Sequence, residues 1–294
     1  MTSDLEDAPA GRTTLMPYWD RVAGQYAADD PLGAVCYPAA PAWFNRFYAF
    51  FHRRAVERML GDLPLAGTRC LDVGCGSGRW CRWLAARGAQ VTGIDPTAAM
   101  LDAARRLSPS VEFHRMSATN IDLPAGSFDL ITTVTVIQHL QPAEQERAVA
   151  SMGRAIRPGG MLFALDLIDV RDPGRVVYPR SPASWIALYE RQGMDLVRWE
   201  GQEYVPLIRA LEKLLRPKKR ATETDVTAPS VLEKVGRRRA MFLPLGPVML
   251  LSVPLELLCE RMLPSTWARH GSFLFRKTGG DGTTSTSPAP GRDA

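Results

Sequence analysis

The stretch that decides the fold is LDVGCGSG, residues 71–78, which ends an apolar run and opens a helical pattern. Gly74, Gly76 and Gly78 allow the backbone to turn tightly and to approach a ligand more closely than any Cβ would permit. The helix that follows presents backbone N–H groups that lack partners in its first turn. This combination predicts a site for a nucleotide-like ligand at the end of a strand.

A carboxylate closes the next apolar run. Residues 90–94 form a predicted second strand, and Asp95 follows directly, seventeen residues after Gly78. A carboxylate at this place can accept hydrogen bonds from both hydroxyls of a ribose. The dinucleotide fingerprint Gly-x-Gly-x-x-Gly would need a glycine where the chain has Arg79. The sequence therefore favours a nucleotide-like ligand other than NAD.

Short β-rich runs alternate with helical patterns along most of the chain, which is typical of a doubly wound α/β sheet. The predicted strands are residues 69–73, 90–94, 111–115, 128–134, 161–166, 194–199 and, after an interruption, 270–277. Pro142 and Ser181-Pro182 are expected to begin helices, and Gly88 and Pro158-Gly159-Gly160 to end them. The predicted helix boundaries and the predicted strands indicate the same α/β architecture.

Composition excludes several classes of protein. Hydrophobic residues make up 46% of the 294 residues and charged residues 23%, which does not fit a disordered or collagen-like chain. The five cysteines are odd in number and form no Cys-x-x-Cys pair, so neither a disulfide framework nor a metal site is expected. Residues 1–14 are polar and lack the apolar core of a secretory signal, so the expected location is the cytoplasm.

The positive charge is confined to one segment. Residues 213–239 contain nine basic and three acidic residues. The net charge of this segment, +6, exceeds the net charge of the whole chain, +5. Basicity is therefore a local feature, and it argues against a nucleic-acid partner, which would need a broader basic surface.

Four parts are expected along the chain. They are an N-terminal arm and helical cap (1–62), an α/β domain (63–200 plus 266–278), a lid-like insertion that is basic and then apolar (201–265), and a disordered tail (279–294). The cap has aromatic and apolar residues every four positions from Trp43 to Met59, which predicts a buried helix face that packs on the core or lines a ligand pocket. The apolar run 240–255 contains three prolines and is too short and too broken to span a membrane.

Together these motifs resemble the class I S-adenosylmethionine-dependent methyltransferases of the small-molecule type. The matching stretches are LDVGCGSG (71–78), GIDP (93–96), LPAGSFDLI (123–131), VIQHL (136–140) and RPGG (157–160). The resemblance implies S-adenosylmethionine as the cofactor. It also implies a doubly wound, Rossmann-like sheet of seven strands, with the last strand antiparallel beside the sixth, an N-terminal helical cap and an insertion before the last strand.

The resemblance also assigns cofactor contacts. It implies that Gly74 and Gly76 line the methionine part and that Asp95 holds the ribose. It implies that residues 116–118 flank the adenine. Many relatives have Asp-Ala where this chain has Ser117-Ala118, and a serine can bind an adenine edge but lacks the charge. The remaining expected contacts are Asp72, Cys75, Pro96, Met116 and Thr135.

Methyl transfer is a substitution at carbon in which the protein mainly aligns the nucleophile with the sulfonium. An alcohol or phenol acceptor benefits from a general base, and His139 lies just past the fourth predicted strand, at the carboxyl edge of the sheet. The resemblance implies that Asp166 orients the imidazole or binds the acceptor. A packing role for His139 is the alternative, and His52, His114 and His270 are expected to be structural or surface residues.

The acceptor is expected to be a small hydrophobic molecule, such as a natural product or a lipid-like compound, methylated on oxygen. The apolar residues of 242–258 favour it, and the arginines 237–239 before them also fit peripheral contact of 237–258 with an anionic membrane. Alternatives are a nucleic-acid methyltransferase, although the chain lacks the usual Asn/Asp-Pro-Pro-aromatic motif, and a cofactor-binding protein or cyclase that transfers no methyl group. The oligomeric state is left open.

Overall fold

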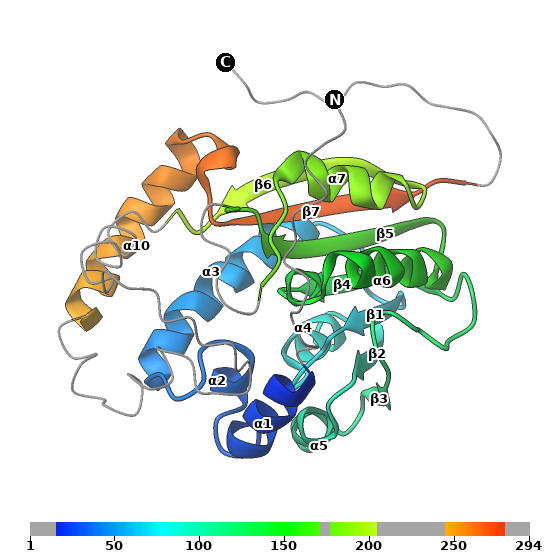
Figure 1. The fold of residues 1–294 in the computed structure, drawn as a ribbon, viewed down its shortest axis with the longest axis horizontal. Coiled ribbons are helices and arrows are strands. Elements are labelled where there is room, and N and C mark those ends of the chain that lie inside the picture. The colour runs from blue at the N-terminus through cyan, green and yellow to red at the C-terminus, as the bar shows by residue number, and fades with distance from the viewer. Residues whose placement is uncertain (1–15, 171–176, 205–244, 280–294) are drawn as a thin grey trace.

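A computed structural model describes residues 16–170, 177–204 and 245–279, and they contain one mixed sheet (Figure 1). The strand order is β3-β2-β1-β4-β5-β7-β6. The strands are β1 (Arg69–Val73), β2 (Gln90–Asp95), β3 (Glu112–Arg115), β4 (Phe128–Val134), β5 (Ile156–Leu167), β6 (Met194–Gln202) and β7 (His270–Lys277). Strands β1 to β5 pair in parallel, and β7 runs antiparallel between β5 and β6. The doubly wound seven-stranded fold is confirmed.

Helices cover both faces of this sheet (Figure 1). They are α1 (Met16–Tyr26), α2 (Pro31–Val35), α3 (Ala42–Leu60), α4 (Arg79–Ala85), α5 (Ala98–Leu107), α6 (Pro142–Ala155), α7 (Pro182–Glu190) and α10 (Leu245–Met262), with short 3-10 turns η1 (Ile137–His139) and η3 (Ser265–Trp267). Helices α3 and α4 share one apolar cluster with β1, β4, β5 and β7, and α6 and α7 share another on the opposite face. As predicted, Pro142 begins α6, and Ser181 caps α7 by accepting a hydrogen bond from the Ser184 amide at 3.3 Å.

The described part of the N-terminal cap, residues 16–62, contains three helices, and the predicted buried face of α3 is confirmed for Phe51, Ala55 and Met59 but not for Trp43. Its buried side chains include Phe44, Tyr48 and Phe51, whereas Trp43 is 37% exposed. A spacing of four residues drifts by about 40° per step on a helix of 3.6 residues per turn. Trp43, at the start of the predicted series, has therefore rotated out of the face that contains Met59.

Two strands are longer than predicted. β5 begins at Ile156, so it includes Pro158-Gly159-Gly160, which were expected to lie before the strand. Ile156 pairs with Phe128, and the register with β4 then shifts before Leu130, which accommodates the additional residues. β6 extends to Gln202, two residues beyond the expected domain boundary at 200.

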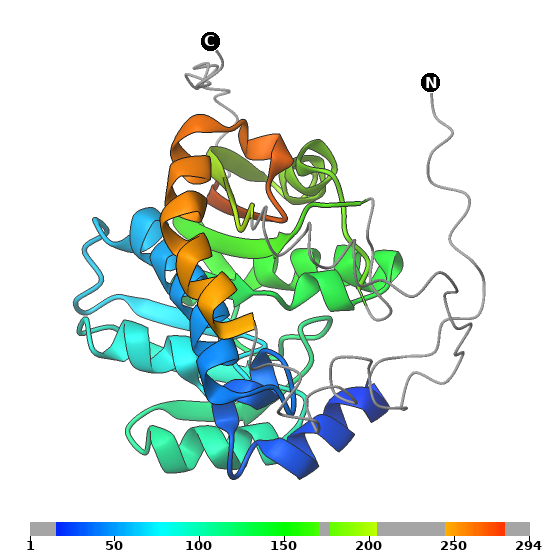
Figure 2. The ribbon, with the colours of Figure 1, turned by 90° about the vertical axis from the view of Figure 1, so that its left-hand side faces the viewer.

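The described apolar part of the predicted insertion, from residue 245 onward, forms one continuous helix, α10, although it contains prolines. Pro247 lies in the first turn, where no helical N–H bond is needed, and Pro254 is accepted inside the helix. Helix α10 lies along α3 (Figure 2), and the nearly buried Glu260 accepts hydrogen bonds from Arg54 and Arg58 of α3. Residues 205–244 and 280–294, which include the basic segment and nearly all of the predicted tail, lie outside the described residues.

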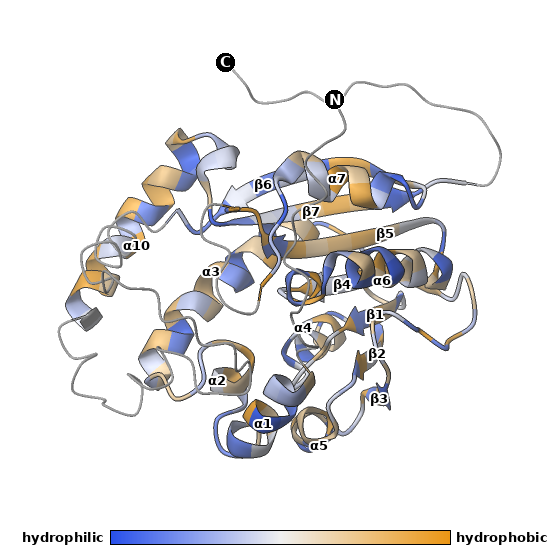
Figure 3. Ribbon diagram, viewed as in Figure 1, coloured by the Kyte–Doolittle hydropathy of each residue, from blue (hydrophilic) through white to orange (hydrophobic). Residues whose placement is uncertain are grey.

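Hydropathy along α10 is mixed, with apolar and polar turns in succession (Figure 3). Among the helices that the structure describes, none has the length and apolar character required to cross a bilayer.

Candidate functional site

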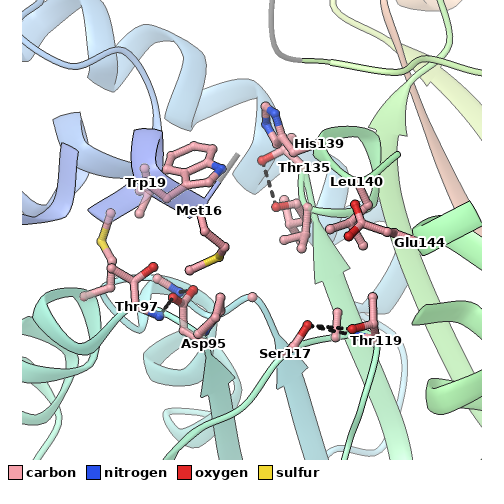
Figure 4. Close-up of a pocket in the computed structure, with 18 residues that line it drawn as sticks. Met16, Trp19, Asp95, Thr97, Ser117, Thr119, Thr135, His139, Leu140 and Glu144 are labelled. Atoms are coloured by element: carbon pink, nitrogen blue, oxygen red, sulfur yellow. Dashed lines mark hydrogen bonds between the residues drawn. The ribbon is translucent and has the colours of Figure 1, made fainter. Parts of the chain in front are cut away.

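A cavity opens at the carboxyl edge of β1, β2 and β4, where the loops after these strands meet helix α1 (Figure 4). Its wall is built from the loops after β1, β2, β3 and β4, from η1, from the N-terminal cap and from the first turns of α5 and α6. The lining residues are Met16, Trp19, Val35, Gly74, Gly76, Asp95, Pro96, Thr97, Met100, Ser117, Ala118, Thr119, Val134, Thr135, Val136, His139, Leu140 and Glu144. The site therefore lies where parallel α/β sheets bind their ligands.

The glycine loop is fixed tightly to the end of β2. The amides of Gly74 and Cys75 donate to the Ile94 carbonyl oxygen at 2.8 and 2.9 Å. Gly74 and Gly76 have φ of +69° and +51°, in the left-handed region that favours glycine. A Cβ on Gly74 would lie 2.5 Å from Val136, so the glycine is also required by the close approach of the segment that leads to η1.

Asp95 joins this loop to the cavity. It is 8% exposed, and its Oδ2 accepts a hydrogen bond from the Gly76 amide at 3.0 Å while its Oδ1 accepts one from the Thr97 amide at 2.9 Å. Burial raises the pKa of Asp95, and these amide hydrogen bonds oppose the rise. A carboxylate oxygen has two lone pairs, so each oxygen can still accept a hydroxyl from the cavity.

The charge of the cavity wall is negative. The acidic side chains among its lining residues are Asp95 and Glu144, and the lining contains no lysine or arginine. Glu144 also accepts a hydrogen bond from the Gln141 amide at 3.1 Å, which fixes its side chain at the start of α6. The wall therefore suits a ligand that carries net positive charge.

The structure brings most of the predicted site residues together. Gly74, Gly76, Asp95, Pro96, Ser117, Ala118, Thr135 and His139 all line the cavity. Asp72, Cys75, Met116 and Asp166 are not among the lining residues.

Asp72 was expected to contact the cofactor, but its side chain points into the core and makes its hydrogen bonds there. It is 1% exposed and accepts hydrogen bonds from Thr132 of β4 at 2.8 Å and from Cys81 of α4 at 3.3 Å. Burial raises the pKa of this carboxyl to about 6. Asp72 thus links β1 to its neighbours beneath the glycine loop. The Cys75 thiol is likewise buried, in the cluster between α4, α5 and β3.

Met116 also differs from the expectation, since it packs against the core on the side of α6. Its neighbours Ser117 and Ala118 are the residues that line the cavity. The Ser117 hydroxyl lies 2.8 Å from that of Thr119 and accepts the Thr119 amide at 3.2 Å, so the serine is held by its own turn.

His139 faces the cavity from η1 and contacts Trp19 of α1 (Figure 4). The two rings meet edge to face, with centroids 5.2 Å apart and an interplanar angle of 82°. Trp19 and Met16 were not predicted as site residues, because α1 carries no motif and its approach to η1 is a long-range contact. The amphipathic, aromatic character of the cap was the available signal.

Asp166 acts on η1 and not on the imidazole. It is 1% exposed, and its Oδ1 accepts a hydrogen bond from the Gln138 amide at 3.0 Å. The Gln138 side chain in turn accepts the Leu167 amide at 2.6 Å. Burial raises the pKa of Asp166 to about 8. These contacts fasten η1, and with it His139, to the end of β5.

Comparison with known proteins identifies a family. Residues 70–160 match the model of a methyltransferase domain. The chain is 39% identical over 180 residues to the ubiquinone biosynthesis O-methyltransferase of Nitrosococcus oceani, covering 52% of this chain and 74% of that protein. It is 34% identical over 160 residues to the protein of the same name from Methylocella silvestris, covering 51% and 61%. The ubiquinone biosynthesis O-methyltransferase of Aromatoleum aromaticum is 39% identical over 105 residues. This match covers 34% of the chain and less than half, 44%, of that relative's length.

Solved structures support the fold alone. The [4+2]-cyclase SpnF aligns with a TM-score of 0.56 at 18% identity, over 90% of this chain and 93% of that one. A putative sarcosine dimethylglycine methyltransferase from Galdieria sulphuraria aligns with a TM-score of 0.53 at 15% identity, over 77% and 86%. The glycine loop, the carboxylate beside it and these relatives lead to one conclusion. The chain belongs to the class I S-adenosylmethionine-dependent methyltransferases, and S-adenosylmethionine is its cofactor.

Proposed function

We propose that this protein transfers the methyl group of S-adenosylmethionine to an oxygen atom of a small hydrophobic molecule, with His139 as the general base. The observation that carries the proposal is that His139 lines the same cavity as Asp95 and the glycine loop. The relatives named ubiquinone biosynthesis O-methyltransferase support methylation on oxygen.

The residues of the cavity fit the cofactor. S-adenosylmethionine carries a sulfonium, an ammonium and a carboxylate, so its net charge is positive and matches Asp95 and Glu144. In the proposed binding mode, Asp95 accepts the ribose hydroxyls, the backbone at Gly74 and Gly76 borders the methionine part, and Ser117 and Ala118 flank the adenine. When bound, the cofactor supplies an activated methyl group.

The acceptor side is formed by η1 and α1. His139 takes the proton of the acceptor hydroxyl as the new O–CH₃ bond forms and the S–CH₃ bond breaks, which leaves S-adenosylhomocysteine. Trp19, edge-on to the imidazole, presents an apolar surface at this point, which supports a hydrophobic acceptor. Asp166 contributes by holding η1 in place.

We also propose that residues 237–258 contact an anionic membrane surface; the alternative is that the segment 201–265 acts as a lid over the acceptor. On the described part, Leu250 and Leu251 of α10 are 73% and 70% exposed. Beside them, Trp43 and Phe50 of α3 and Met249 line an apolar groove between the two helices. Such exposed apolar surface, following the arginines at 237–239, is typical of an interfacial helix.

Asp95→Asn is expected to weaken binding of S-adenosylhomocysteine about 10- to 100-fold. The neutral side chain no longer accepts charge-assisted hydrogen bonds, and its own NH₂ group would face the N–H of Gly76 or Thr97. Isothermal titration calorimetry measures the change. Asp122→Asn, on an exposed side chain, is the control and is expected to bind as the wild type does. Equal affinity of Asp95→Asn and wild type would contradict the binding mode.

His139→Ala is expected to lower turnover by about 10²-fold or more, since the acceptor loses its base, while the affinity for S-adenosylhomocysteine stays nearly unchanged. Release of S-adenosylhomocysteine in the presence of the acceptor measures turnover. His114→Ala is the control, because His114 lies on edge strand β3 and pairs with Glu112 at 2.9 Å. Unchanged turnover of His139→Ala at saturating acceptor would remove His139 from the mechanism.

Flotation with liposomes that contain anionic lipid tests the membrane contact. The wild type is expected to float with the liposomes, and a variant with the arginines 237–239 changed to glutamate is expected to float less, because their attraction to the lipid headgroups is reversed. Neutral liposomes are the control. If neither protein floats with anionic liposomes, the membrane proposal fails.

A further inference from the structure

A buried chain of ionisable side chains lies beside the glycine loop but outside the cavity lining. It runs from Arg79 at the start of α4 through His52 of α3 to Glu203, just after β6, and ends at His270, the first residue of β7. Arg79 Nη2 is 3.3 Å from His52 Nδ1, His52 Nε2 is 2.8 Å from Glu203 Oε1, and Glu203 Oε2 is 3.0 Å from His270 Nδ1. Four separate elements therefore meet at one polar cluster.

The hydrogen-bonding types in this cluster determine the state of His52. Arginine can only donate, so His52 Nδ1 accepts from Arg79, which leaves the proton on Nε2, the nitrogen that lies 2.8 Å from the Glu203 carboxylate. A proton on Nδ1 would face the guanidinium of Arg79. The contacts therefore require the neutral imidazole with its proton on Nε2.

The charges agree with this assignment. Burial lowers the pKa of His52, and Arg79 and His270 lower it further against the opposite effect of Glu203. Burial alone would raise the pKa of Glu203, but the two imidazoles hold it well below its ordinary value. Arg79 and Glu203 carry opposite charges and His52 lies between them, in a buried place where an uncompensated charge would be costly.

The other groups that face the cluster come from α2 and β1. Cys36, which follows α2, has its Sγ 3.8 Å from Arg79 Nη1, and burial raises the pKa of this thiol, so it stays uncharged. Asp72 of β1 also acts on Arg79 electrostatically. Within the part of the chain described by the structure, Arg79, Glu203 and His270 act on His52 itself, whereas Cys36, Asp72 and Arg82 of α4 act on Arg79.

The cluster touches the cofactor loop from two sides. Arg79 follows Gly78 directly as the first residue of α4, and its guanidinium joins this point to Cys36 and His52. Cys36 follows Val35, whose side chain lines the cavity. Val35 packs so closely on the glycine loop that a Cβ on Gly76 would lie 2.6 Å from it. Glu203 is itself held in a left-handed conformation, φ +57°, and its carbonyl oxygen accepts the Arg269 amide at 3.2 Å. A change at His52 is therefore transmitted to the loop that borders the cofactor.

We propose that His52 is a positioning residue for the cofactor site: as a neutral bridge between Arg79 and Glu203 it holds the glycine loop, and its protonation in acid weakens cofactor binding. This inference concerns the binding of the cofactor and is independent of the proposed acceptor and of the proposed base. It is tested with the ligand S-adenosylhomocysteine alone, so its outcome is independent of methyl transfer.

The test compares His52→Gln with His52→Leu by calorimetry with S-adenosylhomocysteine at about pH 8 and about pH 5. A glutamine amide can accept from Arg79 and donate to Glu203, as the neutral imidazole does, but it takes up no proton. We expect His52→Gln to bind as the wild type does at the higher pH, and His52→Leu to bind about tenfold or more weakly. At the lower pH the wild type is expected to lose more affinity than His52→Gln.

Acidic groups that do not contact His52, Asp95 among them, are common to the wild type and His52→Gln, so the difference between these two proteins reports on His52 and its partner Glu203. His114→Gln, on the exposed edge of the sheet, is the matched control and should keep the pH dependence of the wild type. The inference is overturned if His52→Gln loses as much affinity in acid as the wild type, or if folded His52→Leu binds as tightly as the wild type at the higher pH. Should His52→Leu not fold, the pH comparison still decides.

Discussion

The site depends on the hydrogen bonds that tie the glycine loop to the end of β2. Parallel pairing of β1 with β2 places Val73 opposite Ile94, so the loop after β1 begins where β2 ends. The loop amides then donate to the Ile94 carbonyl and to the Asp95 carboxylate. Because the loop amides bond both to the β2 backbone and to the Asp95 side chain, the same interactions that shape the loop also orient the carboxylate.

The two ends of the cavity are built by different means. In the proposed binding mode, the cofactor end consists of backbone and one acidic side chain at the edge of the sheet, whereas the acceptor end consists of side chains from α1 and η1. Buried Asp166 and Gln138 stabilise η1 against β5, so His139 is presented from a short turn that is anchored in the core. This division explains how one fold keeps its cofactor while its acceptors vary.

The sequence was sufficient to predict that the glycine loop and Asp95 lie together at the cavity, because each part of this arrangement is local. A strand, a glycine loop, a helix and an acid at the end of the next strand can all be recognised within residues 69–95. The contribution of Trp19, the phase of α3 and the cluster of His52, Glu203 and His270 could not be predicted in this way. Each depends on contacts between residues far apart in the chain, and none of these residues belongs to a motif.

The direction of single side chains was also beyond the sequence patterns. Asp72 lies within the matching motif, yet it bonds to β4 and α4, and Asp166 bonds to the backbone of η1 and not to His139. In both cases the buried carboxylate accepts hydrogen bonds from donors inside the fold, as buried polar groups generally do. Proximity in sequence to a ligand motif therefore did not ensure contact with the cavity.

The central claim is that a positively charged adenosyl ligand occupies the cavity between the glycine loop and Asp95. Calorimetry on the wild-type protein with S-adenosylmethionine and, separately, with NAD tests it most directly. The account predicts saturable binding of S-adenosylmethionine and no heat of binding with NAD. Binding of the dinucleotide by well-folded protein that gives no signal with S-adenosylmethionine would contradict it.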